Sequence, residues 1–222
     1  WQERRFLPSL VQQELVLAGR FGKKSGQGVY NWRSDRPAAS WLETVSNADS
    51  AMSVQRRSDG VTEIDGLLLI ETQGETAQAL ANRYGQPVVV CDRQEGDVAV
   101  IAVAASNPAS ANRKAVWHLQ QQGKRVLQVA DYPGLLIWRT VAMIVNEALD
   151  ALQKGVASEQ DIDTAMRLGV NYPRGPLAWG EQLGWQRLLR LLENLQRHYG
   201  EERYRPSSLL RQRALLESSY ES

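Results

Sequence analysis

The chain has 222 residues, a formal net charge of +1 and 43% hydrophobic residues. This composition is typical of a soluble globular protein, and the length allows one large domain or two small ones. The near-neutral charge does not favour a nucleic-acid partner. Basic pairs such as Arg56-Arg57 also have acidic residues close by, so we interpret them as solvated surface. The longest apolar run, Val98 to Ala105, is too short to cross a bilayer.

Cysteine usage and the first residue give two further expectations. The single cysteine, Cys91, excludes an internal disulfide framework and fits a reducing cytoplasm. It lies in a β-branched stretch, which predicts an inert buried thiol. The chain opens on Trp1 and not on Met, so we expect a fragment of a longer protein.

Four segments of different texture follow one another along the chain. Residues 1–33 hold a short apolar stretch and a Gly-rich run, and residues 34–58 are polar and predict a connection with a short helix over 41–45. Residues 59–130 alternate between strand and helix patterns, whereas 131–222 are almost entirely helical. The order predicts an α+β chain: a small α/β sheet segment followed by an all-α helical bundle.

Within the third segment, the short apolar runs predict buried strands at 66–71, 87–91, 98–103 and 125–129. Helices are expected between them, over 76–84 and 112–122, each closed by a glycine. Strands separated by helices favour a sheet with some parallel pairing.

In the last segment, apolar residues at a spacing of three to four predict helices over 135–154 and 185–199. Ser158, followed three positions later by Asp161, predicts a helix start, and Gly169 its end. A turn at 173–176 leads into a short helix that ends at Gly184.

The Gly-rich run over 19–28 resembles a phosphate loop only superficially. It contains neither GxGxxG nor a strand followed by GxxxxGK, so its glycines are assigned to tight turns and close packing. Lys23 and Lys24 remain weak candidates for attracting an anionic part of a substrate. The turn after the strand at 66–71 also offers one glycine and two carboxylates, which repel phosphate, so we predict a sheet that binds no nucleotide.

Titratable and nucleophilic residues do not form a catalytic constellation. His118 and His198 lie far apart in sequence and are interpreted as surface or packing residues. One cysteine and two scattered histidines cannot make a zinc site, and no serine lies in a GxSxG motif. The chain is therefore expected to hold no catalytic residue, no metal and no cofactor.

The two ends of the chain contain similar stretches. Arg, an aromatic residue, Pro, Ser and an aliphatic residue recur in the same order at 5–11 and at 203–209. A repeat of this kind indicates that the chain begins at the tail of one helical domain and ends with a second copy.

The helical segment resembles the C-terminal domain of the 3-hydroxyacyl-CoA dehydrogenase family. The residues that carry the resemblance form an ordered set: Asp131-Tyr132-Pro133-Gly134, Asn146-Glu147-Ala148, Gly155-Val156, Asp161 to Met166, Gly169, Tyr172 to Leu177 and Gly184. The stretch from Gly19 to Tyr30 looks like the terminal signature of an earlier copy, and the middle segment looks like the reduced Rossmann-like insert of a bacterial branch with two such domains.

The resemblance implies an enzyme whose N-terminal Rossmann domain binds NAD and carries a catalytic His–Glu pair, both expected upstream of Trp1. It also implies an acyl-CoA substrate, a cytoplasmic location and a homo-oligomer assembled through helical domains. The family carries an asparagine in a motif that here reads Gly134 to Arg139, and Trp138 replaces it. An indole cannot supply the acceptor of an amide, so the second copy is expected to be structural.

Two other interpretations remain open. The chain could be a self-sufficient helical module for oligomerisation or CoA binding, which an upstream reading frame without a GxGxxG segment would favour. It could also be the helical dimerisation domain of an unrelated dehydrogenase, which the signature from Gly134 to Pro176 disfavours.

Overall fold

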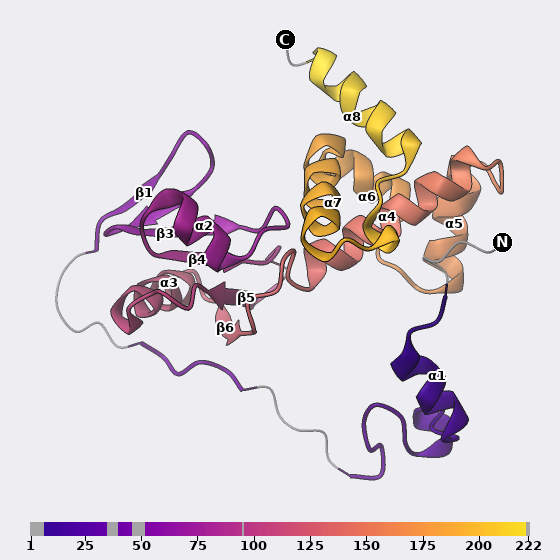
Figure 1. Cartoon of the computed structure of the whole chain (residues 1–222), viewed down its shortest axis with the longest axis horizontal. Helices are drawn as coiled ribbons and strands as arrows, with labels where there is room; N and C mark the ends of the chain where they lie inside the picture. Colours follow the sequence, from indigo (N-terminus) through magenta and orange to yellow (C-terminus); the bar gives the residue numbers. More distant parts are fainter. Residues whose placement is uncertain (1–6, 35–39, 46–51, 95, 221–222) are drawn as a thin grey trace. The chain divides into compact units, whose positions relative to one another are not determined.

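The computed structural model describes residues 7–34, 40–45, 52–94 and 96–220, with side chains as far as residue 217. The chain divides into two compact units, Trp1–Ser40 and Trp41–Ser222. We call them the N-terminal unit and the main unit. The main unit consists of a sheet region, residues 41–130, and a helical bundle, residues 131–220 (Figure 1).

The N-terminal unit holds helix α1 (Leu10–Leu17) and the short 3-10 helix η2 (Lys23–Ser25). The Ser9 hydroxyl accepts a hydrogen bond from the Gln12 amide and caps α1, as expected for serine before a helix. In the Gly-rich run, a Cβ at Gly28 would lie 2.7 Å from the Gly22 Cα, so the two backbone stretches can approach this closely only because residue 28 is glycine. The assignment of these glycines to turns and close packing is confirmed.

The sheet region contains six strands that are hydrogen-bonded in sequence order. They are β1 (Val54–Arg56), β2 (Thr62–Ile64), β3 (Leu67–Glu71), β4 (Val88–Cys91), β5 (Val98–Val103) and β6 (Arg125–Gln128). The pairs β3–β4 and β5–β6 are parallel, with Glu71 opposite Cys91 at the carboxyl end of the first pair. The other neighbouring pairs are antiparallel. The expected parallel pairing is confirmed.

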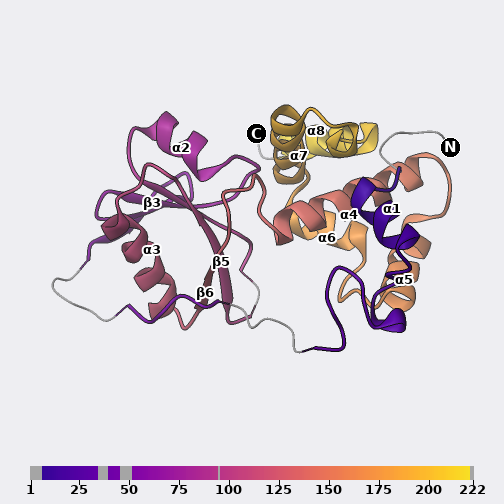
Figure 2. The ribbon, with the colours of Figure 1, turned by 60° about the horizontal axis from the view of Figure 1, so that its bottom comes forward.

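One helix covers each face of this sheet (Figure 2). Helix α3 (Ala109–Gln121) packs on the face that carries Leu67 and Leu69, and α2 (Ala77–Tyr84) on the face that carries Leu68 and Ile70. Alternate residues of β3 therefore point into two separate cores, which explains why the strand reads as a continuous apolar run.

The helix expected at the start of the main unit is wrong, and two short strands near it were not predicted. Residues 41–45 form no helix: Trp41 makes an antiparallel bridge to Leu127, and the Leu42 amide donates to the Val126 carbonyl, so this stretch extends along β6. The Arg125 guanidinium lies 4.4 Å from the Trp41 ring centroid and holds that side chain at the sheet. Strand β1, inside the expected connection 34–58, and strand β2 were not predicted, because both are short and mostly polar.

The bundle consists of α4 (Ile137–Gln153), α5 (Glu159–Gly169), α6 (Pro176–Leu183), α7 (Trp185–Tyr199), the 3-10 helix η3 (Glu202–Tyr204) and α8 (Ser208–Tyr220). Its core is formed mainly by α4 and α7, where Leu188, Leu191, Leu192 and Leu195 are buried. The expected ends at Gly169 and Gly184 and the expected range 185–199 are confirmed, and α3 begins at Ala109, three residues earlier than expected. Over the ranges described above, no helix is long and apolar enough to span a bilayer.

Candidate functional site

The carboxyl ends of the parallel strands β3 and β4 are the place where an open α/β sheet holds a ligand. Strand β3 ends at Glu71 and β4 at Cys91, and the chain continues from them into the turn 72–76 and into Asp92. Both ends lie next to the helical bundle, because side chains from α4 and α7 reach them. This edge is therefore the candidate site, and its contacts decide what it can bind.

Asp92 connects the end of β4 to the start of α4. Its carboxylate is fully buried and accepts hydrogen bonds from three successive amides: Leu136 at 2.8 Å, Ile137 at 2.7 Å and Trp138 at 3.0 Å. These amides have no partner inside the helix, and a carboxylate there also interacts favourably with the helix dipole. Asp92 thus joins the sheet region to the bundle and occupies an N-terminus that could otherwise hold an anion.

Trp138 fills the space beside this cap. The side chain is 1% exposed, and its Nε1 donates to the Glu71 Oε1 at 2.7 Å. The Arg187 guanidinium lies 4.0 Å from the indole centroid and makes an ion pair with the same Glu71 oxygen at 3.0 Å. Three residues from β3, α4 and α7 therefore form one packed cluster, which we call the Trp138 cluster.

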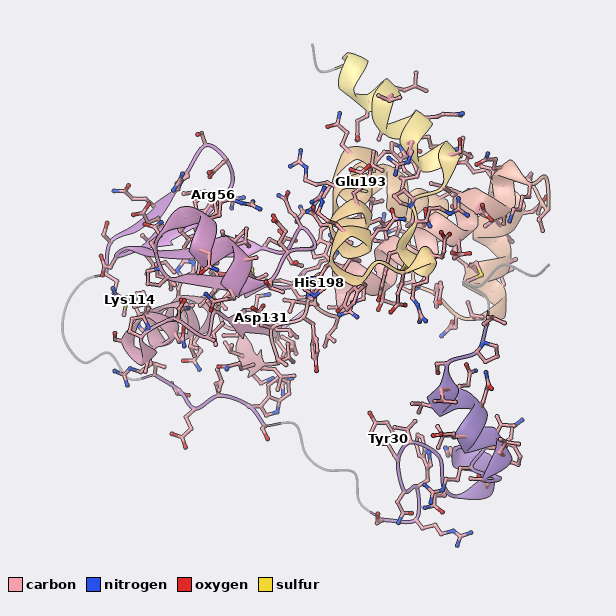
Figure 3. All side chains as sticks on the ribbon, viewed as in Figure 1. Tyr30, Arg56, Lys114, Asp131, Glu193 and His198 are labelled. Atoms are coloured by element: carbon pink, nitrogen blue, oxygen red, sulfur yellow. The ribbon has the colours of Figure 1, made fainter. Side chains whose placement is uncertain are left out.

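The N-terminus of α2 is also occupied by the protein itself. Asp131 accepts from the amides of Ala77 at 2.7 Å and Gln78 at 2.9 Å, and the Thr76 hydroxyl accepts from Ala79. Asp131 lies on the side of the sheet region that faces the bundle (Figure 3). A dinucleotide would need these same amides for its pyrophosphate, and the carboxylate repels that charge.

The turn between β3 and α2 leaves no room for a dinucleotide either. Gly74 has φ +92°, and a Cβ built there would lie 2.6 Å from the Leu191 carbonyl oxygen of α7. The Asn194 amide of α7 donates to the Gln73 carbonyl at 2.8 Å. The glycine thus serves close packing against α7, and the residues of this edge do not fit NAD.

The candidates taken from the sequence lie on different elements of the chain. Lys23 and Lys24 are exposed in the N-terminal unit, whereas Trp138 lies in the main unit. His118 is on α3, where it lies 2.8 Å from the Gln122 side chain and where burial lowers its pKa, and His198 is on α7 with its ring edge against Tyr199. Among the residues that the structure describes, no group of His, Cys, Asp and Glu could hold a metal.

Cys91 is buried, as expected from its strand. Burial, together with the smaller effect of the nearby Glu71 and Asp92 carboxylates, raises the pKa of its thiol to about 12. A thiol in this state is a packing residue and not a nucleophile.

Sequence reasoning did not find the partners of Asp92 and Arg187. Asp92 comes directly after a buried strand, which is the only local signal of its position. Nothing near Arg187 in the sequence indicates a contact with Glu71, because the two are more than a hundred positions apart. Contacts of this kind depend on how the bundle packs on the sheet.

Two family models match the chain. Residues 134–219 match the 3-hydroxyacyl-CoA dehydrogenase C-terminal domain, and residues 69–133 match the 3-hydroxybutyryl-CoA dehydrogenase reduced Rossmann-fold domain. The chain belongs to the 3-hydroxyacyl-CoA dehydrogenase family. The matches meet between residues 133 and 134, just before α4, so in this chain the Trp138 cluster joins the two matched domains.

The curated relatives that the chain matches are dehydrogenases of the same family. The chain is 78% identical over all of its 222 residues to a 3-hydroxyadipyl-CoA dehydrogenase from Escherichia coli strain K12, and covers 47% of that protein. A probable 3-hydroxybutyryl-CoA dehydrogenase from Bacillus subtilis is 38% identical over 92 residues, which are 41% of this chain and 32% of the relative.

Among solved structures, a 3-hydroxybutyryl-CoA dehydrogenase from Escherichia coli K12 superposes with a TM-score of 0.95 at 77% identity. The match covers 99% of this chain and 47% of that one. The chain therefore spans about half the length of the dehydrogenase relatives that it matches from end to end.

Proposed function

We propose that these 222 residues form the C-terminal portion of an NAD-dependent dehydrogenase that oxidises 3-hydroxyacyl-CoA to 3-oxoacyl-CoA. In this portion they support the substrate cleft and the assembly of the enzyme, and do not carry out the reaction. The observation that carries the proposal is the Trp138 cluster, which fills the junction between the sheet region and the bundle.

The burial of Trp138 is the first argument. This residue stands where the family motif has an asparagine, and an indole offers a donor but no amide acceptor. Its one donor is already bonded to Glu71, and its ring is stacked against Arg187. A side chain engaged in this way positions two domains against each other, and has no group free to orient a hydroxyacyl substrate.

The second argument concerns the cofactor. The α2 N-terminus is capped by Asp131 and the turn at Gly74 packs on α7, so NAD has no place at the edge of this sheet. NAD and the acid/base pair are then expected in the other half of the enzyme, since the Escherichia coli relative is about twice as long as this chain. When bound there, NAD accepts the hydride.

Four further assignments belong to the same proposal. Residues 1–33 are the tail of a first helical domain, 34–58 a linker, 59–130 a reduced Rossmann-like domain and 131–222 a second helical domain. The enzyme acts on short acyl chains of the 3-hydroxybutyryl or 3-hydroxyadipyl type, as in phenylacetate breakdown. It is a cytoplasmic homo-oligomer that associates through its helical domains. It binds neither nucleic acid nor membranes.

The proposal is tested first on the chain as it stands. Purified residues 1–222 are mixed with NAD⁺ and (S)-3-hydroxybutyryl-CoA, and NADH formation is followed at 340 nm, with the Escherichia coli relative as the active control. We expect no turnover and no NAD⁺ binding in calorimetry. Hydride transfer by residues 1–222 would overturn the proposal.

The supporting role needs a chimaera. Residues 1–222 replace the matching half of the Escherichia coli relative, and we expect an active enzyme. Removing 41–222 from the chimaera should abolish its activity or its assembly, measured by turnover and by size-exclusion chromatography with light scattering. Full activity and an unchanged number of subunits after this deletion would exclude a role in cleft support or assembly.

A Trp138 variant separates positioning from chemistry. In the chimaera, Trp138→Phe keeps an aromatic ring at this position but removes the N–H that donates to Glu71. Trp138→Asn restores the amide of the family motif. If Trp138 only positions the domains, Trp138→Phe should retain most activity and Trp138→Asn should lower the unfolding midpoint. A gain of activity in Trp138→Asn would instead show that this copy can still act on substrate.

A further inference from the structure

A cavity of about 310 Å³ lies between the sheet region and the bundle, beside the Trp138 cluster. One wall is the β1–β2 hairpin with Arg56 (labelled in Figure 3), and the opposite wall is the start of α7 with Arg187 and Arg190. The volume is at the lower end of the range for small-molecule sites. The space is therefore suited to a small organic group and not to a whole dinucleotide.

The charges around this cavity do not cancel. Glu71 is paired with Arg187 at 3.0 Å, and Asp59 with the neighbouring Arg57 at 3.3 Å. Arg190 donates to the neutral Gln73 side chain at 3.1 Å. Among the residues that the structure describes, neither Arg56 nor Arg190 has a carboxylate partner, so two positive charges face the cavity uncompensated.

The cavity also has an apolar floor and a fixed arginine. Val61 and Ile70 line it and are 6% and 8% exposed. Arg187 is held by both the Trp138 ring and Glu71, and its buried Nε has no hydrogen-bond partner in the part of the chain that the structure describes. A guanidinium held in this way loses little conformational entropy when an anion binds next to it.

We infer that this cavity binds an organic phosphate through a phosphate monoester. A monoester carries nearly two negative charges at neutral pH and so matches the two uncompensated arginines, whereas a carboxylate carries one. Arginine forks bind phosphate oxygens through paired N–H donors, and the apolar floor contacts the sugar that carries the phosphate. Coenzyme A presents such a group, the 3′-phosphate of its nucleotide. The assignment does not depend on catalysis by this chain.

The inference is tested by calorimetry on residues 1–222 in a low-salt buffer without phosphate. The probes are 3′,5′-ADP, the nucleotide end of coenzyme A, and inorganic phosphate alone. We expect 3′,5′-ADP to bind, more tightly than inorganic phosphate, and to bind more weakly as NaCl is raised. No binding of 3′,5′-ADP would overturn the inference, and binding without preference over inorganic phosphate would overturn the assignment to an organic phosphate.

Two single variants and a matched control locate the site. Arg56→Gln and Arg190→Gln each remove one exposed charge and keep most of the stem, so the fold should be unchanged by circular dichroism. Each is expected to weaken 3′,5′-ADP binding about tenfold. Arg167→Gln removes an exposed arginine of α5 that does not line the cavity, and should leave binding unchanged. Equal affinity in all three variants would place the ligand elsewhere.

Discussion

Helices α1 and α8 have the same kind of serine cap at their N-termini but differ in how deeply their side chains are buried. Each follows a Pro-Ser pair, and each serine hydroxyl accepts from the amide three positions later at 3.2 Å: Ser9 from Gln12, and Ser207 from Leu210. Helix α8 buries Leu210 completely, whereas α1 buries no residue within its unit, and its Leu10 is 69% exposed. The repeat seen in the sequence is therefore a repeat of local structure, although Arg5 and Phe6 of the first copy lie outside the described residues.

The difference arises from a partner that lies far away in sequence. Asn146 of α4 is fully buried; its Nδ2 donates to the Arg205 carbonyl and its Oδ1 accepts from the Ser207 amide at 2.7 Å. These two bonds hold the start of α8 against the bundle. The comparison teaches that a cap determines where a helix begins, and that a buried partner determines whether it contributes to a core.

Removing the buried contact of α8 should have the largest effect. We expect Leu210→Ala to lower the free energy of unfolding of the main unit by about 2–5 kcal/mol, because it leaves a cavity in the bundle core. Leu10→Ala, its control in α1, should change the same transition by less than about 0.5 kcal/mol. Urea unfolding followed by tryptophan fluorescence measures both. Equal losses would show that α1 is as buried as α8.

Breaking the polar contact should have the next largest effect. Asn146→Ala takes away the Asn146 side chain that the buried Ser207 amide and the Arg205 carbonyl bind. We expect a loss of about 2–4 kcal/mol in the same unfolding experiment, since the loss of each such bond costs about 1–3 kcal/mol. Amide hydrogen exchange should show the loss first in α8. Unchanged protection there would contradict the role given to Asn146.

The two caps give a smaller contrast. Ser207→Ala should destabilise the main unit by about 1 kcal/mol, because the cap starts a helix that is part of the core. Ser9→Ala removes an equivalent bond in α1, and should leave the transition of the main unit unchanged within about 0.5 kcal/mol. Differential scanning calorimetry of the two variants against the unchanged chain measures this contrast, and equal shifts in the main transition would refute it.

The smallest effect is the pH dependence that the Cys91 thiol adds to the free energy of unfolding. Cys91 is the single cysteine of the chain and lies in the main unit, so this contribution reports on that unit. Its folded pKa is raised to about 12 by burial, whereas an unfolded thiol titrates near about 8.5. The raised pKa stabilises the fold fully below about pH 8.5, and this contribution is lost as the pH rises toward 12.

Between pH 8 and 9 we expect a loss below about 1 kcal/mol in urea unfolding. The loss should be smaller in Cys91→Ala, which has no thiol to titrate. Rapid labelling of Cys91 by a thiol reagent in the folded protein at pH 8 would contradict its burial.

The sequence predicted the order of the elements well where the patterns were strong. The strands β3 to β6 and the helices α2, α4, α6 and α7 lie where apolar runs and closing glycines indicated them. The helix predicted over 41–45 was wrong because Trp41 and Leu42 are bound to β6, which is more than eighty positions away. Strands β1 and β2 were missed because the hairpin carries polar residues that are not typical of a buried strand.

The candidate site was predicted only in part. The repulsion of phosphate by carboxylates near 71–75 could be inferred from the residues themselves, whereas the replacement of an asparagine by Trp138 was implied by the resemblance to the family. The neighbouring residues of Asp92, Asp131 and Arg187 in the sequence do not indicate that these side chains cap or cover the same edge of the sheet. Their partners lie in other elements, so their roles could not be inferred.

By itself, then, the sequence determined the places of the buried strands and of most helices of the bundle, because capping, apolar periodicity and the conformational freedom of glycine act within a few residues. It also determined the family, because the signature residues stand in order along the chain. Only the tertiary structure decided that Asp131 and Asp92 occupy the helix N-termini and that Trp138 fills the junction. Those outcomes depend on desolvation and packing between segments that are distant in sequence, where a buried carboxylate or indole persists only if a partner from another element satisfies it.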